Sequence, residues 1–169
     1  MSEENKGSEE NSYQVTSRQQ VTESSALLLG KAKRTIDILV YDYDDVLLPH
    51  NEITDWLTGF FLQHNQNRFR YLCSESDLLR ERGRRLIELA RKYSTYIKLR
   101  KIPEGLKPVN RQYMVIDAAA SMQTQDHRSF DYYVHLDNRA RGRQLENHFD
   151  ELWQRAEGIA GIHVTGLSG

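Results

Sequence analysis

The sequence predicts an α/β domain in which helices cover both faces of a mixed, mostly parallel sheet. Two observations support this class. Short β-branched apolar runs alternate with amphipathic stretches of helical period as far as residue 109. The chain has 169 residues with 38% hydrophobic content, which is enough for one domain with one core and tails at its ends.

The elements expected in the first part of the chain alternate in type. Helices are expected at about 17–33, 52–63 and 77–93, because apolar residues there show helical spacing. Strands are expected at 35–41, 69–73 and 96–100, where the runs are apolar and β-prone. The third helix starts near Ser74 to Asp77, which fits the Ser/Thr-x-x-Asp/Glu signature of a helix N-terminus.

The second part of the chain begins with a strand at 110–117, in which Tyr113, Val115 and Ile116 are β-formers. Residues 118–125 fit a strand hairpinned onto it, and 131–136 fit another strand. Asp137 or Asn138 then caps a long last helix. We divide the chain into a disordered acidic tail at 1–18, a folded domain at 19–158 and a C-terminal tail at 159–169.

Composition excludes several classes of function. A formal charge of -1 gives no global basic signature, so nucleic-acid or membrane-surface binding needs a local patch. Cys73 is the single cysteine, which excludes an intramolecular disulfide framework and a Cys-rich zinc site. The six histidines lack metal-ligand spacing, so we expect no metal and no cofactor. The start of the chain and the absence of a long apolar run predict a cytoplasmic protein without membrane insertion.

The strand at 110–117 has a spacing that resembles the phospholipase D superfamily. That superfamily has His-x-Lys, four further residues and Asp on such a strand, which aligns Asn110, Gln112 and Asp117 with its three motif positions. In the resembled enzymes the histidine attacks phosphorus and the lysine neutralises phosphoryl oxygens. Asparagine is no nucleophile at neutral pH and glutamine carries no charge. The resemblance therefore implies a catalytically degenerate half-domain whose amides can still hydrogen-bond a phosphate or a sugar.

The resemblance covers about residues 20–157. Its other parts are the helix running into 32–38, the strand near 131–136 and the closing stretch 149–153. The runs at 83–94 and 137–141 are similar to small bacterial phospholipase D-like domains that lack the catalytic pair. The Gly-Ser-x-Asn turn of the active enzymes is replaced by 122–125. We take four residues as candidate ligand-binding residues and none as catalytic: Asn110, Gln112, Asp117 and Thr124.

The resemblance also bears on partners. Active members of the superfamily build one site from two half-domains, so a single half is expected to pair with itself as a homodimer. A monomer is the alternative, because a chain without the catalytic pair has no need of a shared site. The expected ligand is an unidentified phosphate-containing molecule or a protein partner.

A phosphatase is a second interpretation of the sequence. Asp42 and Asp44 follow the strand at 35–41 and fit the first motif of haloacid-dehalogenase-like phosphatases, where one aspartate is the nucleophile, the next is the acid/base and magnesium bridges them to phosphate. Ser74 and Lys107 match two further requirements of that family. Asp117 is followed by three alanines where a second metal-binding acid is needed, which argues against this interpretation.

A nucleic-acid-binding module is a third interpretation. The segment 80–101 contains nine Lys and Arg residues against two Glu, and its candidate contacts are Arg80, Arg84, Arg85 and Arg91. Such a run fits an electrostatic footprint for phosphates. The alternative is a solvated helix face with no ligand.

Overall fold

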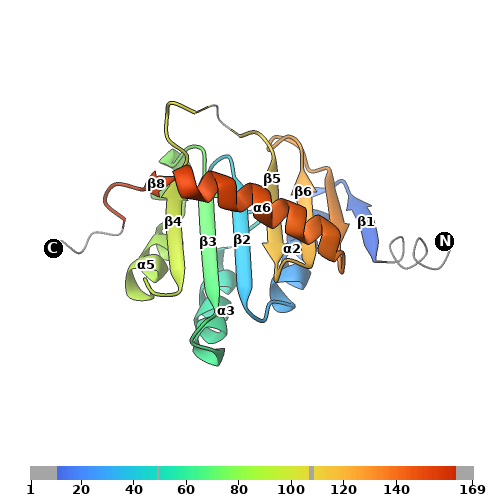
Figure 1. Cartoon of the computed structure of the whole chain (residues 1–169), viewed down its shortest axis with the longest axis horizontal. Helices are drawn as coiled ribbons and strands as arrows, with labels where there is room; N and C mark the ends of the chain where they lie inside the picture. Colours follow the sequence, from blue (N-terminus) through green and yellow to red (C-terminus); the bar gives the residue numbers. More distant parts are fainter. Residues whose placement is uncertain (1–10, 49, 107–108, 163–169) are drawn as a thin grey trace.

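The computed structural model describes residues 11–48, 50–106 and 109–162, which build one eight-stranded sheet with the order β1-β7-β6-β5-β2-β3-β4-β8 (Figure 1). The strands are β1 (Ser12–Val15), β2 (Thr35–Val40), β3 (Arg68–Cys73), β4 (Ile97–Lys101), β5 (Gln112–Ile116), β6 (Ala120–Thr124), β7 (Tyr132–His135) and β8 (Glu157–Gly158). The predicted α/β class with a mixed sheet is confirmed.

The sheet is less parallel than predicted. Within the described residues, parallel pairing joins β2 to β3 and β3 to β4, and the remaining pairings are antiparallel. The reason lies in β5, which pairs antiparallel with β2 and turns directly into β6. A turn as short as the one between β5 and β6 joins only antiparallel strands.

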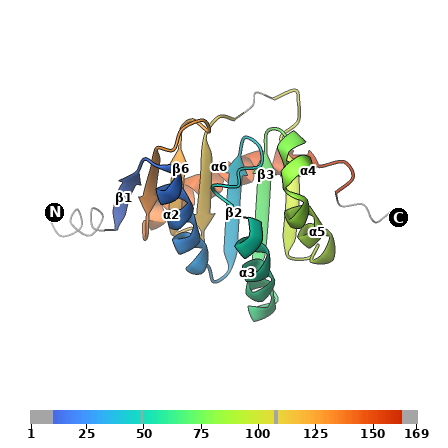
Figure 2. The same ribbon diagram turned by 180° about the vertical axis from the view of Figure 1, so that it is seen from behind.

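Helices cover both faces of the sheet, as predicted. Four helices lie on one face (Figure 2): α2 (Arg18–Gly30), α3 (His50–Gln63), α4 (Asp77–Arg82) and α5 (Arg84–Lys92). On the other face the long helix α6 (Arg139–Arg155) crosses the strands (Figure 1). The expected helix at 77–93 is thus two helices, separated at Gly83, where an added Cβ would meet the Leu79 carbonyl oxygen at 2.8 Å.

The core is divided by the sheet into a large and a small cluster. The large cluster lies under the four helices, and includes Ile36, Ile38 and Val40 of β2. The small cluster lies under α6, where Leu39 of β2 packs with Phe149 of the helix. This division follows from the alternation of side chains along a strand.

A buried charged cluster holds α6 on the small core. Asp37 and Arg70 are register partners on β2 and β3, and Arg70 donates to both Asp37 oxygens at 2.8 and 3.1 Å. The same guanidinium donates to Asp150 of α6 at 2.8 Å and lies 4.8 Å from the centroid of the Phe149 ring. Because the Asp37 side chain is fully buried, Arg70 supplies the charge compensation that burial requires.

The ordered region extends beyond the predicted domain at both ends. Residues 12–15, predicted within the disordered tail, form β1 and pair with β7, which satisfies their backbone groups. Ile159 and Ile162 lie in the predicted C-terminal tail but are buried in the large cluster. Residues 1–10 and 163–169 of the two predicted tails lie outside the described residues.

Candidate functional site

Gln112, at the lysine position of the phospholipase D-like motif, is buried at the start of β5. Its Oε1 accepts a hydrogen bond from the Tyr41 backbone N–H at 3.0 Å. Its Nε2 donates to Asp44 Oδ2 at 3.1 Å and to Tyr132 Oη at 3.0 Å. A side-chain amide has two N–H donors, so both donors of Gln112 are used within the protein.

Asn110 and Thr124 lie at the same edge of the sheet as Gln112. Thr124 is the register partner of Gln112 and is buried, with its hydroxyl donating to the Asp126 carbonyl at 3.2 Å. Asn110 is exposed, and its carbonyl accepts from the His127 N–H at 2.8 Å. The structure therefore brings three of the four candidate residues together.

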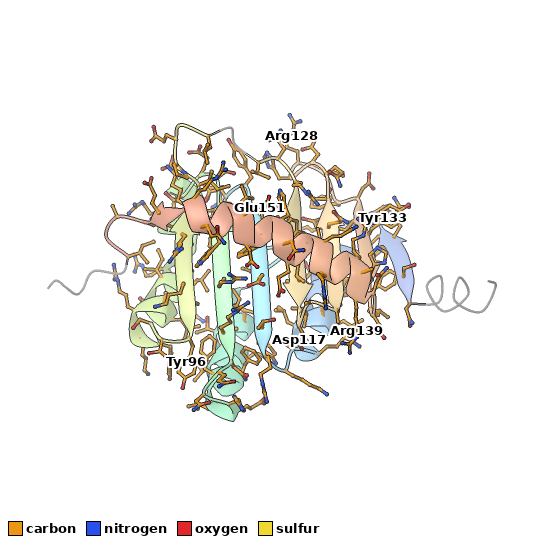
Figure 3. The ribbon with its side chains drawn as sticks, viewed as in Figure 1. Tyr96, Asp117, Arg128, Tyr133, Arg139 and Glu151 are labelled. Atoms are coloured by element: carbon orange, nitrogen blue, oxygen red, sulfur yellow. The ribbon has the colours of Figure 1, made fainter. Side chains whose placement is uncertain are left out.

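Asp117, the fourth candidate, lies at the opposite end of β5, roughly 17 Å away for a strand of this length. In Figure 3 it is labelled at the lower edge of the sheet, while Arg128, which follows β6, is labelled at the upper edge. Its carboxylate accepts from the backbone N–H groups of Lys33, Arg34 and Thr35 at 2.9, 2.8 and 2.8 Å. Asp117 therefore anchors the entrance to β2 and does not share a site with Gln112.

The two aspartates of the phosphatase-like motif also bind the chain itself. Asp42 accepts from the backbone N–H groups of Leu78 and Leu79 at 2.9 and 3.2 Å, and so caps α4. Asp44 Oδ1 accepts from the Val46 N–H at 2.9 Å, while its Oδ2 accepts from Gln112. The helix-start signature is close to the observed start of α4, but Asp42 provides the cap.

Ser74, the first residue of the predicted helix-start signature, does not cap α4. Its hydroxyl accepts from the Val109 N–H at 3.0 Å. Lys107, the other residue matched to the phosphatase family, lies outside the described residues. Across the described parts of the chain, no group of three or more His, Cys, Asp or Glu side chains is arranged to hold a metal ion.

The basic segment 80–101 does not form one surface. Arg80, Arg84 and Arg85 are exposed on α4 and α5. Arg91 donates to the Ile162 carbonyl at 3.0 Å. Arg100 lies under α6 on the other face of the sheet, where it donates to the Trp153 carbonyl at 3.1 Å. The segment is thus divided between two faces, and two of its arginines bind backbone.

A basic hollow that the sequence did not predict lies at the Asp117 edge of the sheet. Its volume is about 1050 Å³, and we call it the lower hollow. Its cationic lining residues are Lys31, Lys33, Arg34, Arg68 and Arg139. These residues come from three separate segments, which are residues 31–34, the start of β3 and the start of α6. Only Lys31, Lys33 and Arg34 form a visible group in the sequence, and they resemble the basic end of a helix.

The fold is that of a phospholipase D-like domain, and comparisons with solved structures agree. Nuc, a phospholipase D family member from Salmonella typhimurium, has a TM-score of 0.57 and 13% identity over 88% of this chain and 97% of its own. NucT from Helicobacter pylori has a TM-score of 0.60 and 11% identity over 88% of this chain and 98% of its own. At such identities the likeness shows the fold alone.

A longer protein shares the same fold. TrmBL2, an archaeal chromatin protein, has a TM-score of 0.64 and 15% identity over 88% of this chain and 54% of its own, so this chain spans about half of its length. By sequence, the chain belongs to the family described as Domain of unknown function (DUF7931), whose model matches residues 17–162. No curated protein matches the sequence. None of the helices in the described part of the chain has the length and apolar composition needed to span a bilayer.

Proposed function

We propose that this protein is a non-catalytic phospholipase D-like domain that acts by binding a phosphate-containing ligand or a protein partner. The observation that supports this most directly is the buried amide of Gln112, whose two donors are used by Asp44 and Tyr132. Phosphoryl transfer through this fold needs a nucleophile and a cation that face the phosphorus. The lysine position holds a neutral side chain turned into the core, and the histidine position holds an exposed asparagine.

Asp117 supports the same proposal. Its carboxylate is surrounded by three backbone N–H donors at the opposite edge of the sheet. A carboxylate with this number of backbone bonds stabilises the fold. The presence of an aspartate at this motif position therefore has a structural explanation that needs no catalysis.

The phosphatase interpretation has weaker support. A nucleophilic aspartate must direct a free oxygen at the phosphate, beside a bound magnesium ion. Both oxygens of Asp42 accept backbone N–H bonds from α4, and both oxygens of Asp44 accept bonds within the protein. We therefore rank this function below the binding function.

Nucleic acid is the ligand class that we consider first. The archaeal chromatin protein with the same fold is reported to bind DNA. This is a property of that protein, but it is compatible with a phospholipase D-like fold that binds a phosphodiester without cleaving it.

An activity screen of the purified chain tests the proposal. Hydrolysis of bis-p-nitrophenyl phosphate and of p-nitrophenyl phosphate is measured with and without magnesium. We expect no turnover above that of the Asn110→Ala and Asp42→Asn variants. A double Asn110→His/Gln112→Lys variant is also expected to stay inactive, because a lysine at 112 would replace a buried structural amide. Turnover of the diester that disappears in Asn110→Ala contradicts the proposal, and magnesium-dependent turnover that disappears in Asp42→Asn favours the phosphatase.

We also propose that the chain forms a homodimer, by analogy with the paired half-domains of the active enzymes. A two-fold interface would cover the upper edge of the sheet, near Asn110. Light scattering at micromolar concentration tests this. A mass of about twice 19.8 kDa supports the dimer, whereas a mass near 19.8 kDa contradicts it.

A further inference from the structure

The lower hollow lies at the edge of the sheet opposite to the degenerate motif. It is formed by the connection from α2 to β2, the start of β3, the turn from β5 to β6 and the start of α6. Figure 3 shows Asp117 and Arg139 labelled at this edge. Because Gln112 and Asn110 lie at the other edge, the hollow is separate from the phospholipase D-like motif.

The cationic side chains of the lower hollow are available to a ligand. All five are exposed. Arg34 Nη1 donates to the Lys33 carbonyl at 2.9 Å and to Asn67 Oδ1 at 3.4 Å, which leaves other donors of its guanidinium open. Among the residues that the structure describes, the side chains of Lys31, Lys33, Arg68 and Arg139 make no hydrogen bond or ion pair.

The acidic side chains of the hollow do not cancel this charge. They are Asp117, Asp137 and Glu146. The Asp117 carboxylate is compensated by its three backbone donors. Burial, with the nearby charges of Asp37 and Asp150, raises the pKa of Glu146, and the nearby charges of Arg68 and Arg70 oppose this shift. Five cationic side chains therefore line the hollow with three acidic ones, a formal excess of two positive charges.

The turn at the centre of the hollow connects the backbone segments that carry Lys33, Arg34 and Arg139. Asp117 and Ala118 both have positive φ, 54° and 52°, and Asp117 ties this turn to the backbone of Lys33 and Arg34. The Asn138 N–H donates to the Ala119 carbonyl at 2.8 Å, which ties the same turn to the start of α6 beside Arg139. This turn is thus hydrogen-bonded to two other parts of the hollow. The start of β3 is linked to the connection from α2 to β2, because the Arg68 N–H donates to the Arg34 carbonyl at 2.9 Å.

The character of the lining points to an extended polyanion. Small-molecule sites enclose their ligand and fix it with a few buried polar groups. Here the cations are exposed around a wide hollow, and the described lining residues include no aromatic side chain for stacking on a base. We propose that the lower hollow binds the phosphodiester backbone of a nucleic acid without reading its sequence. This inference rests on the proposed binding function and assigns it a site.

Binding to a labelled mixed-sequence duplex of about 20 base pairs, measured by fluorescence anisotropy at 50 and 200 mM salt, tests the inference. The test variant is Lys33→Ala/Arg68→Ala/Arg139→Ala. The matched control is Arg18→Ala/Lys98→Ala/Arg155→Ala, which removes the same charge from exposed positions on α2, β4 and the end of α6, outside the lower hollow. Circular dichroism and thermal melting confirm that both variants are folded.

We expect the test variant to bind about tenfold or more weakly, and its log-log salt slope to be smaller in magnitude by about two to three, since each lost phosphate contact removes about 0.9. The control is expected to stay within about twofold of the parent. Equal losses in the two variants, or no binding by the parent at 50 mM salt, would overturn the inference.

Sodium tripolyphosphate, titrated by calorimetry, distinguishes a site for small phosphates. If it binds stoichiometrically through the same three residues while the duplex does not bind, the nucleic-acid inference is wrong. The bound duplex is also recovered and run on a denaturing gel. Cleavage of the duplex would contradict the non-catalytic function. An intact duplex, with a loss of binding affinity confined to the test variant, supports both the non-catalytic function and the site in the lower hollow. Failure of the function and failure of the site are therefore distinguishable.

Discussion

Gln112 Nε2 donates a hydrogen bond to Asp44 Oδ2 over 3.1 Å. This contact joins the lysine position of the phospholipase D-like motif to the second aspartate of the phosphatase-like motif. The two sequence patterns that suggested two different enzymes therefore meet in one buried network. Each pattern has a structural explanation, which is why the binding function is favoured over either activity.

The Gln112 network is predicted to stabilise the fold. Gln112→Ala removes the hydrogen bonds of Gln112 to Asp44 Oδ2, Tyr132 Oη and the Tyr41 N–H, and we expect a loss of about 2–3 kcal/mol in the free energy of unfolding. Urea denaturation measures this. The matched control is Asn110→Ala, which changes an exposed side chain and is expected to cost less than about 0.5 kcal/mol. Equal stability of the two variants would show that the network is not structural.

Arg70 is predicted to be essential for attaching α6. Arg70→Ala leaves the fully buried Asp37 without a counter-charge, and we expect a loss of about 3–5 kcal/mol in the free energy of unfolding. Denaturant titration measures it, and tryptophan fluorescence reports on α6 through Trp153. As a control, Arg128→Ala removes the exposed ion pair with Asp126 and is expected to cause no measurable change. If both arginines could be removed without effect, Arg70 would not hold α6 in place.

The β5–β6 turn is predicted to be strained at Ala118. Its φ of 52° is unfavourable for a residue with a Cβ, so Ala118→Gly is expected to raise the free energy of unfolding by about 0.5–1 kcal/mol. Gly142→Ala is expected to lower it by about 1–3 kcal/mol, because the new Cβ would overlap the Ala118 carbonyl group. Thermal melting of the two variants measures both effects. Destabilisation by Ala118→Gly would contradict the strain.

His148 is predicted to make stability depend on pH. Its Nδ1 lies 2.7 Å from Tyr113 Oη, and burial, assisted by Arg111, lowers the pKa of His148 from its usual value of 6.5. The unfolded chain then binds more protons than the folded one below pH 6.5, so stability falls as the pH drops through and below this value. Melting temperatures at pH 7.5 and about pH 5.5 measure the fall.

The control for this prediction is His148→Asn, which keeps a polar atom near Tyr113. It is expected to reduce the fall in melting temperature without removing it, because burial also lowers the pKa of His135. The raised pKa of Glu146 acts in the opposite direction at lower pH, so parent and variant are compared at the same pH. An unchanged pH dependence in the variant would show that His148 does not contribute.

The sequence by itself determined the elements whose signals are local. The sequence predicted Asp137 or Asn138 as the cap of α6, and the structure selects Asn138, whose side chain accepts from the Arg141 N–H at 3.0 Å. The apolar runs at β2 and β3 and the start of α6 depend on neighbours within a few residues. The same holds for the α/β class, which follows from the order of these elements. The phospholipase D-like spacing was also readable, because its positions lie on or directly beside one strand.

Tertiary structure alone decided the roles of the residues that meet over long sequence distances. β1 is a four-residue strand that is ordered by pairing with β7, so its own composition did not predict it. Asp42 caps a helix 36 residues further on, and Asp117 binds backbone 82 to 84 residues away. The cations of the lower hollow come from three segments that are far apart in the sequence. In each case the packing of the sheet and its helices determines which groups meet. A carboxylate or a cation gives the same local sequence signal whether it binds backbone, a metal or a ligand in the folded protein.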